Sequence, residues 1–557
     1  MAVIFCENEV DGMHYHKIVR DTEKRADFFL NHQILDPREP NYGGLLTEGG
    51  LVQAKSTMYG AANLIALYCN QDSRYHQDRR LLDRVRIALA YVKRQHNEDG
   101  TFDYINCNFN AAPDTAFCLK GLLPSWRLLC MKEDADSTAL KNDIADIFRR
   151  AAYGIMQGGF HTPNHRWAIA SILMACFNMF GDESMKAVAD SYLLEGIDCT
   201  GDGEYAERSA GGYNAVNNDA MILLGEETGD ESYFGHVVRN LNMMFTYVEP
   251  DGSIFTNNST RQDYGRKVYP ENYYFEYLYM AHRTGNAAFA AAANQIMEDI
   301  IERGHLAPDC LPDLMANPQL VGWKPEGCGF PTQYRRNYRD SGIVRVRRGD
   351  TSYSLLNNSD RFLYFQTGAL TASLRIGVTY FDQRSFRIQQ LEEREGGFTL
   401  HYKAAGWYYK PFKENPGTTD WWAMDNASRE KIHGPDLQFT VWVDEVEDGV
   451  SVRIKTEGCP KVPVKVELCL SKGCSVHSEH FMTEGAAGGS IVAASGTVTV
   501  EKGVDVMRIG PAFGTHHFVG GYAGSETASR DHFTLYFTDY SHFDRTFVLS
   551  NANGRPL

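Results

Sequence analysis

The sequence predicts a multi-domain α+β protein in which an N-terminal (α/α) toroid is followed by a C-terminal antiparallel β-sandwich. From about residue 10 to residue 335, apolar residues recur at helical spacing. From about residue 342 onward, apolar and polar residues tend to alternate with period two, as in antiparallel strands. Because 557 residues exceed what one hydrophobic core accommodates, we expect two large domains, residues 1–335 and 336–557.

The helical half contains a weak internal repeat. Asp-Gly pairs at residues 99–100, 202–203 and 251–252 each follow a predicted helix and precede a polar loop and another helix. With Gly-Gly pairs at intermediate places, the step is about fifty residues, the length of one helical hairpin and its loop. The repeat predicts a ring of helix pairs whose glycine-containing loops all open on one face.

In the second half, the segment 462–468 has an aliphatic residue at every even position, which is typical of a strand with one buried face. Pro463 lies within this segment and cannot donate to a hydrogen-bond ladder. We therefore expect its strand to lie at the edge of a sheet.

Composition limits the possible partners. The net charge of −16 argues against nucleic acid and anionic membranes as partners, since either requires a clustered basic face. The first residues lack the basic and apolar regions of a secretory signal, so we expect a cytoplasmic protein. Histidine and cysteine spacings do not match a zinc site, and we expect neither a metal nor a cofactor.

The most informative residues are polar and lie in two loops. Asn164, His165 and Arg166 immediately precede an apolar helix, and Tyr205, Arg208 and Tyr213 follow about forty residues later, around the second Asp-Gly pair. An amide, an imidazole, guanidinium groups and phenols on one face can neutralise a sugar carboxylate and move the proton beside it. This combination indicates a polysaccharide lyase.

The predicted architecture and these residues resemble the polysaccharide lyases of the heparinase II/III, alginate lyase and chondroitin/hyaluronan lyase type. In that group an Asn and a His commonly lie on the carboxylate side and a Tyr handles protons, which implies catalytic roles for Asn164, His165 and Tyr213. The small-residue run before Tyr213 is similar to the family's, and Tyr205 is the alternative. The heparinase II/III group usually has a histidine-containing cluster early in its β domain. This chain has no histidine between His305 and His401, so a divergent uronate lyase fits better.

The expected reaction is β-elimination at C4 of a uronic acid, with a uronic-acid-containing oligosaccharide or polysaccharide as substrate and an exo-acting cut. The substrate carboxylate must be neutralised before the C5 proton can leave, by Asn164 with a protonated His165 or with Arg166. Tyr213 takes the C5 proton or gives one to the leaving oxygen. Further substrate-binding candidates are Tyr205, Arg208, Arg261 in a polar loop, and Trp407 in the β domain.

A glycoside hydrolase acting on the same substrates is the alternative, because helical toroids also carry that chemistry and fold alone does not choose. A hydrolase needs two carboxyl groups, usually one protonated and one ionised. The candidates on the same loop face are Asp103, Asp202, Glu204 and Glu207.

Overall fold

A computed structural model describes residues 13–321, 323, 329–381, 383–520 and 529–553. The chain forms two compact units, the first made of Met1–Val248 and Gly252–Pro331 and the second of Glu249–Asp251 and Thr332–Leu557. The division therefore falls after residue 331 instead of 335, because the first strand of the second unit already begins at Gln333. The sequence did not predict that residues 249–251 belong to the second unit.

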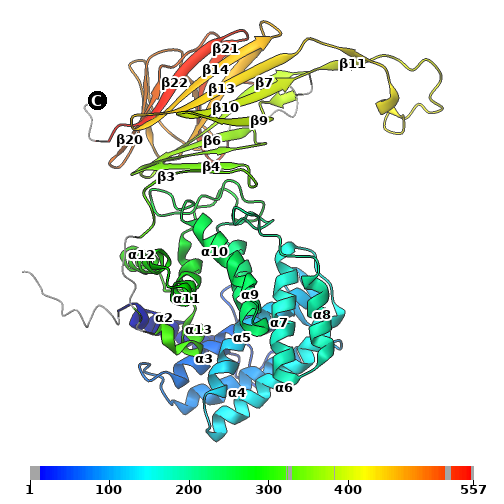
Figure 1. The fold of residues 1–557 in the computed structure, drawn as a ribbon, viewed down its shortest axis with the longest axis vertical. Helices are drawn as coiled ribbons and strands as arrows, with labels where there is room; N and C mark the ends of the chain where they lie inside the picture. Colours follow the sequence, from blue (N-terminus) through cyan, green and yellow to red (C-terminus); the bar gives the residue numbers. More distant parts are fainter. Residues whose placement is uncertain (1–12, 322, 324–328, 382, 521–528, 554–557) are drawn as a thin grey trace, which may run out of the picture. The chain divides into compact units, whose positions relative to one another are not determined.

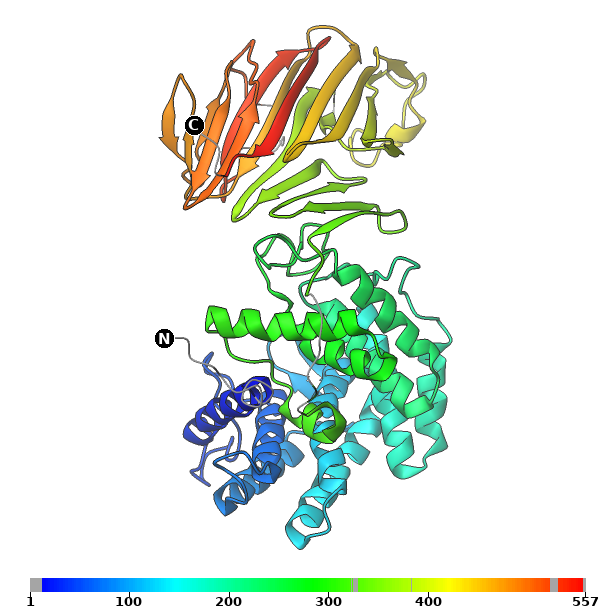
Figure 2. The ribbon, with the colours of Figure 1, turned by 60° about the vertical axis from the view of Figure 1, so that its left-hand side comes forward.

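The first unit consists of helices in two layers (Figures 1 and 2). Every second helix has a larger fraction of its residues buried than its neighbours have. The inner helices are α3 (Ala54–Cys69), α5 (Ala112–Cys130), α7 (Pro163–Phe180), α9 (Tyr213–Thr228), α11 (Tyr274–Thr284) and the short α13 (Leu311–Ala316). The outer helices are α2 (Met13–His32), α4 (Arg79–Arg94), α6 (Ala135–Gln157), α8 (Glu183–Leu193), α10 (Ser232–Met244) and α12 (Ala287–Arg303). Inner helices pack on one another in chain order, α3 on α5, α5 on α7 and α7 on α9. The predicted toroid is confirmed.

Three successive inner helices, α5, α7 and α9, run in the same direction. At the C-terminal ends of α5 and α9, the Arg127 guanidinium donates to Glu226 Oε2 at 2.7 Å and to Glu227 Oε1 at 2.5 Å. Asn178, near the C-terminus of α7, donates to Glu227 Oε2 at 2.7 Å. Because these C-termini meet, the N-termini of the same helices and the loops before them share the opposite end of the unit.

Glycines in those loops pack against the outer helix that follows. Gly100 has a φ of 94°, and a Cβ there would lie 2.3 Å from the carbonyl oxygen of Arg150 in α6. Gly203 has a φ of 102°, and its Cβ would lie 2.4 Å from the carbonyl oxygen of Arg239 in α10. Only glycine fits such a position, so the sequence repeat reflects a repeated packing of loop on helix.

The second unit is a sandwich of two sheets around one apolar core. In sheet order, the first sheet contains β17 (Met482–Glu484), β16 (Ser475–His477), β19 (Val498–Lys502), β20 (Asp505–Gly510), β22 (Asp544–Asn551), β14 (Gly449–Gly458), β13 (Leu437–Val446), β10 (Gly397–Ala404) and β9 (Gln390–Arg394). The second contains β18 (Ser490–Val492), β21 (Phe533–Tyr540), β15 (Pro463–Leu470), β7 (Leu370–Tyr380), β6 (Arg361–Thr367), β5 (Thr351–Leu356), β4 (Ile343–Arg348) and β3 (Gln333–Tyr338), with β8 (Gln383–Ser385) on β7. All named pairs are antiparallel except β18 with β21.

The expectation of an edge strand at Pro463 is wrong. Strand β15 lies between β7 and β21, and its alternate residues Val464, Val466 and Leu468 enter the core as the period-two pattern predicts. Pro463 is tolerated because it is the first residue of β15, where pairing with β7 begins only at Val464.

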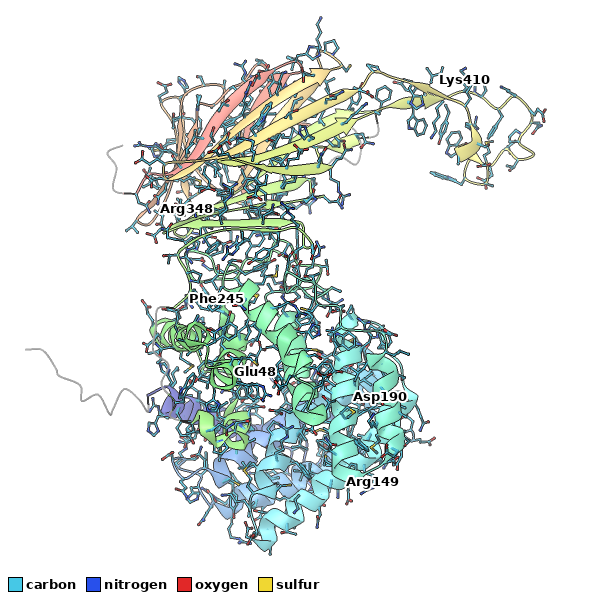
Figure 3. The ribbon with its side chains drawn as sticks, in the orientation of Figure 1. Glu48, Arg149, Asp190, Phe245, Arg348 and Lys410 are labelled. Atoms are coloured by element: carbon cyan, nitrogen blue, oxygen red, sulfur yellow. The ribbon has the colours of Figure 1, made fainter. Side chains whose placement is uncertain are left out.

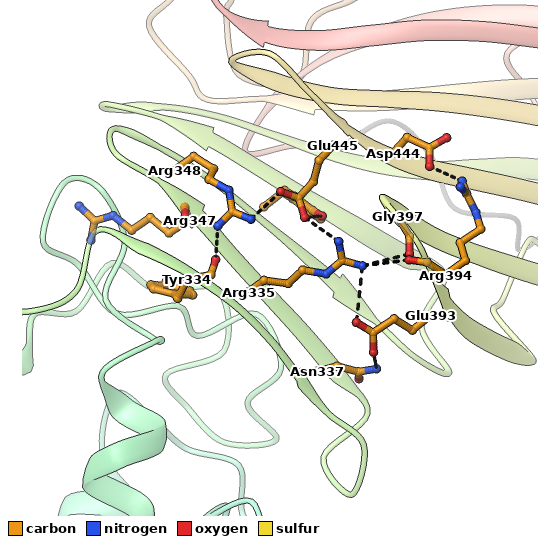
Figure 4. A network of polar contacts seen from close by, with 11 residues as sticks. Tyr334, Arg335, Asn337, Arg347, Arg348, Glu393, Arg394, Gly397, Asp444 and Glu445 are labelled. Atoms are coloured by element: carbon orange, nitrogen blue, oxygen red, sulfur yellow. Dashed lines mark hydrogen bonds and ion pairs between the residues drawn. The ribbon is translucent and has the colours of Figure 1, made fainter.

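Ion pairs connect the two sheets at one edge (Figure 4). Glu445 of β13 accepts from Arg335 of β3 at 3.0 Å and from Arg348 of β4 at 2.7 Å. Deeper in the unit, Arg345 of β4 is 0% exposed and its Nη1 lies 2.7 Å from Glu249 Oε1. The segment 249–251 thus supplies the carboxylate that pairs with a fully buried arginine.

A two-stranded hairpin of β11 (Trp407–Tyr409) and β12 (Lys431–His433) projects from the sandwich, where Figure 3 labels Lys410. Aromatic and cationic side chains hold it together: the Trp407 and Tyr409 ring centroids are 4.4 Å apart, and Lys431 Nζ lies 4.2 Å from the Trp407 ring. Trp407 therefore has a packing role within this hairpin.

Candidate active site

The N-termini of three inner helices provide the polar residues of the candidate site. Lys55 is the second residue of α3, Asn164 and His165 are the second and third residues of α7, and Tyr213 is the first residue of α9. Backbone N–H groups at helix N-termini have no partner within the helix, and the helix dipole makes this end positive. An anion is therefore favoured at this end of the unit.

Asn164 and Arg261 are linked through one buried carboxylate. Asn164 is 1% exposed, and its Nδ2 lies 2.9 and 2.8 Å from the two oxygens of Glu207. Arg261 Nε lies 3.3 Å from Glu207 Oε1. Burial raises the pKa of Glu207, while the Asn164 hydrogen bond and the Arg261 charge act in the opposite direction. The Oδ1 of Asn164 is buried and has no hydrogen-bond partner among the described residues.

The loop that precedes α9 is fixed by Asp263. Its Oδ1 accepts from Ser209 Oγ at 2.8 Å and from Ser259 Oγ at 2.5 Å, and its Oδ2 accepts from the Gly211 backbone N–H at 2.9 Å. A Cβ on Gly211 would lie 2.9 Å from the same carboxylate, which explains why small residues precede Tyr213. These bonds hold the Arg261 loop against the start of α9.

Tyr213 and Arg261 lie together as a result. The Arg261 guanidinium carbon is 4.8 Å from the centre of the Tyr213 ring, within the range of a cation–π interaction. The Tyr213 side chain is partly buried, and its backbone N–H donates to Ser209 Oγ at 3.1 Å. The contact fixes the Tyr213 ring beside the Arg261 guanidinium.

His165 is buried among rings and cations. It is 8% exposed, and its ring centroid is 4.8 Å from that of His161 and 6.0 Å from that of Phe117. Burial, followed by the charges of His161, Arg261 and Lys55, lowers the pKa of His165 to about 4. The expectation of a protonated His165 is therefore wrong at neutral pH. The imidazole is neutral there, and its buried Nδ1 has no partner among the described residues.

Lys55 belongs to this site and was not predicted. Its ammonium nitrogen lies 5.0 Å from the centre of the Tyr104 ring and 5.2 Å from that of Phe117. Phe117 in turn packs edge-on to His165. The signal that could have found Lys55 is the repeat, because it occupies the start of an inner helix as Asn164 does.

Two predicted substrate-binding residues are turned away from a ligand. Tyr205 is 1% exposed, its hydroxyl donates to Asn218 Oδ1 at 3.0 Å, and burial raises its pKa well above the usual range. Arg166 pairs with Glu195 at 2.9 Å and Asp198 at 2.7 Å. Both expectations are corrected: Tyr205 is a core residue and the guanidinium of Arg166 is already neutralised.

Arg208 and Trp407 remain predictions. Arg208 has a positive φ of 50°, and its side chain is 43% exposed with Nε 3.8 Å from Glu204 Oε2. This distance leaves most of its donors available to a ligand. Trp407 belongs to the second unit, where it packs in the hairpin described above.

The carboxylates of the hydrolase alternative act as acceptors within loops. Asp103 accepts from Asn97 Nδ2 at 2.8 Å and from the Asn110 backbone N–H at 2.7 Å. Glu204 is 3% exposed and accepts from Asn258 Nδ2 at 2.8 Å. Glu207, also 3% exposed, is the partner of Asn164 and Arg261 described above. Asp103 and Asp202 are partly exposed, whereas Glu204 and Glu207 are buried in the contacts that stabilise their loops.

Within the described ranges, no group of three or more His, Cys, Asp or Glu side chains is arranged to hold a metal ion. No helix in the described part of the chain is long and apolar enough to cross a membrane.

Comparisons with known proteins support the fold. No family model and no curated protein matches the sequence. The structure is similar to a heparan sulfate lyase HepC mutant from Pedobacter heparinus, with 12% identity, a TM-score of 0.53, and coverage of 96% of this chain and 84% of that chain. It is also similar to a Paenibacillus xanthan lyase, with 10% identity, a TM-score of 0.56, and coverage of 98% of this chain and 58% of that chain. A third similar structure is the Streptomyces coelicolor A3 chondroitin AC lyase, with 13% identity, a TM-score of 0.53, and coverage of 97% of this chain and 80% of that chain. The expected resemblance to polysaccharide lyases is confirmed as a shared fold.

Proposed function

We propose that this protein is a polysaccharide lyase that cleaves the bond at C4 of a uronic acid by β-elimination and leaves an unsaturated uronate. The observation that carries the proposal is the convergence of Asn164, His165, Tyr213 and Arg261 at one end of the toroid. The shared fold with heparan sulfate, xanthan and chondroitin lyases supports it. The engagement of Glu204 and Glu207 in loop contacts disfavours a hydrolase.

The proposed mechanism begins when donors at the start of α7 bind and orient the uronate carboxylate. His165, whose imidazole is neutral at pH 7, accepts the C5 proton. The electron pair of the C5–H bond forms the C4=C5 double bond, and the C4–O bond breaks. Tyr213 gives its hydroxyl proton to the leaving oxygen, and the phenolate that forms is stabilised by the Arg261 guanidinium. Bulk water then restores both protonation states.

The direct test is ultraviolet absorbance during digestion of heparan sulfate, chondroitin, alginate and polygalacturonate by the full chain. Elimination produces a conjugated double bond that absorbs, whereas hydrolysis does not. Tyr213→Phe removes only the hydroxyl and should lower turnover by about 10² to 10⁴ while substrate still binds. Tyr153→Phe, on outer helix α6, is the matched control and should leave turnover unchanged. Cleavage of any of these glycans without the absorbance rules the elimination out.

Asn164→Ala and His165→Ala test whether catalysis depends on these two residues, as a lyase requires, or on carboxyl groups, as a hydrolase requires. Each should raise the activation barrier by about 3 to 4 kcal/mol, the size seen when one preorganised donor is lost. If the protein is a hydrolase, the large loss of turnover should instead follow substitution of Asp202, Glu204 or Glu207.

We also propose exo action on imported oligosaccharides, which predicts that small unsaturated products appear before the polymer shortens in size-exclusion chromatography.

A further inference from the structure

Lys55 is a cation without an anionic partner inside the candidate site. No ion pair or hydrogen bond joins its ammonium group to a carboxylate anywhere in the described part of the chain. By contrast, Arg166 has two carboxylate partners and Arg261 has one. A lysine that served only to stabilise the loops would be expected to use a carboxylate in the same way.

Aromatic rings hold the Lys55 ammonium group in place. The Tyr104 and Phe117 ring centres are 5.0 and 5.2 Å from Nζ, and the side chain is only partly exposed. A ring face attracts a cation but does not neutralise its charge. The group is thus positioned and partly desolvated at the N-terminus of α3, where the helix dipole adds to the positive potential.

The charges of the other site residues nearly cancel. The Arg261 charge is balanced by Glu207, with Nε 3.3 Å from Oε1, and the imidazole of His165 carries no charge at neutral pH. Lys55 also acts on His165, and no ion pair to its ammonium group is found among the described residues. The two residues are connected through Phe117, whose ring lies 6.0 Å from the His165 ring.

We propose that Lys55 binds the substrate carboxylate and supplies the positive charge that elimination requires. This assignment rests on the proposed function, because it takes the ligand to be a uronate. Asn164 and the N–H groups at the start of α7 then orient the carboxylate, and Lys55 neutralises it. Lys55 would be a substrate-binding residue of the first inner helix, about a hundred residues before the Asn-His pair.

The test compares acid and ester forms of one substrate. The four glycans named above are prepared as tetrasaccharides, with free carboxylates and as methyl esters, and binding to the full-length Tyr213→Phe chain is measured by calorimetry. Lys55→Gln should weaken binding of the free acid by about 10- to 100-fold, as expected for loss of a charge-assisted hydrogen bond. It should leave binding of the ester nearly unchanged, because the ester has no charge to neutralise.

Lys55→Arg should restore most of the affinity for the acid, and Lys132→Gln, at an exposed position beyond the C-terminus of α5, controls for the change in net charge. Equal losses for acid and ester, or no loss for either, overturn the assignment. Absence of binding by every tetrasaccharide overturns it together with the uronate site. Lys55-dependent binding of the acid without ultraviolet absorbance in the digestion of the same glycan supports the assignment while refuting the elimination.

Discussion

Lowering the pH tests the environment of His165. Its pKa is about 4 in the folded chain, against an ordinary value near 6.5. Between these values the unfolded chain binds more protons than the folded chain, so the free energy of unfolding rises with pH. The contribution of neutral His165 to the free energy of unfolding is complete above about pH 6.5. As the pH falls, this contribution decreases by about 2 kcal/mol at pH 5 and by about 3 kcal/mol near pH 4.

Two measurements check this prediction. In the full chain with labelled histidine, the NMR signal that disappears in His165→Gln should titrate near pH 4. When the pH is lowered from 7 to 5, the free energy of unfolding of the helical unit, measured in urea, should fall by about 2 kcal/mol more in the wild-type chain than in the His165→Gln chain. His96, whose pKa burial also lowers to about 4, is present in both chains and cancels in the comparison. A His165 signal that titrates near pH 6.5, or equal losses in the two chains, would refute the reasoning.

Three substitutions examine the surrounding framework. Gly211→Ala places a Cβ 2.9 Å from Asp263 and should cost about 1 to 3 kcal/mol in thermal unfolding of the helical unit; unchanged stability would mean that the loop readily moves. Tyr205→Phe should cost about 1 to 3 kcal/mol through the lost bond to Asn218 yet retain turnover, and a large loss of turnover would restore Tyr205 as a site residue. Glu249→Ala should destabilise the β unit by about 3 to 5 kcal/mol in calorimetry, because the buried charge of Arg345 loses its partner, and a loss below 1 kcal/mol would contradict that pairing.

The fold was largely predictable because each half of the chain repeats one hydrophobic period over many elements. The Asp-Gly repeat also indicated which loops share one end of the toroid, and thus why Asn164 and Tyr213 lie at the same end. Pro463 was misjudged because a proline at the first residue of a strand and one inside an edge strand look alike in sequence. Strand order depends on long-range pairing that no local pattern reports.

Within the site, the sequence did not show that adjacent residues such as His165 and Arg166 have different surroundings. Arg166 follows His165 directly, but successive helical residues point about 100° apart, so the guanidinium reaches Glu195 and Asp198 while the imidazole stays near Phe117. The low pKa of His165 depends on burial and on charges from other loops, which adjacency does not reveal. Lys55 was missed for the same reason, since its relation to His165 exists only in three dimensions.

The short segment 249–251 has a practical consequence for anyone who wishes to divide this protein. A fragment that starts at residue 332 would contain every strand of the sandwich but would lack Glu249, the carboxylate paired with Arg345. The helical fragment cannot be cut out in one piece either, since its chain passes through the other unit between Val248 and Gly252. The two units are therefore interleaved in sequence, and a separate sandwich would need the 249–251 peptide added back, by fusion or in trans.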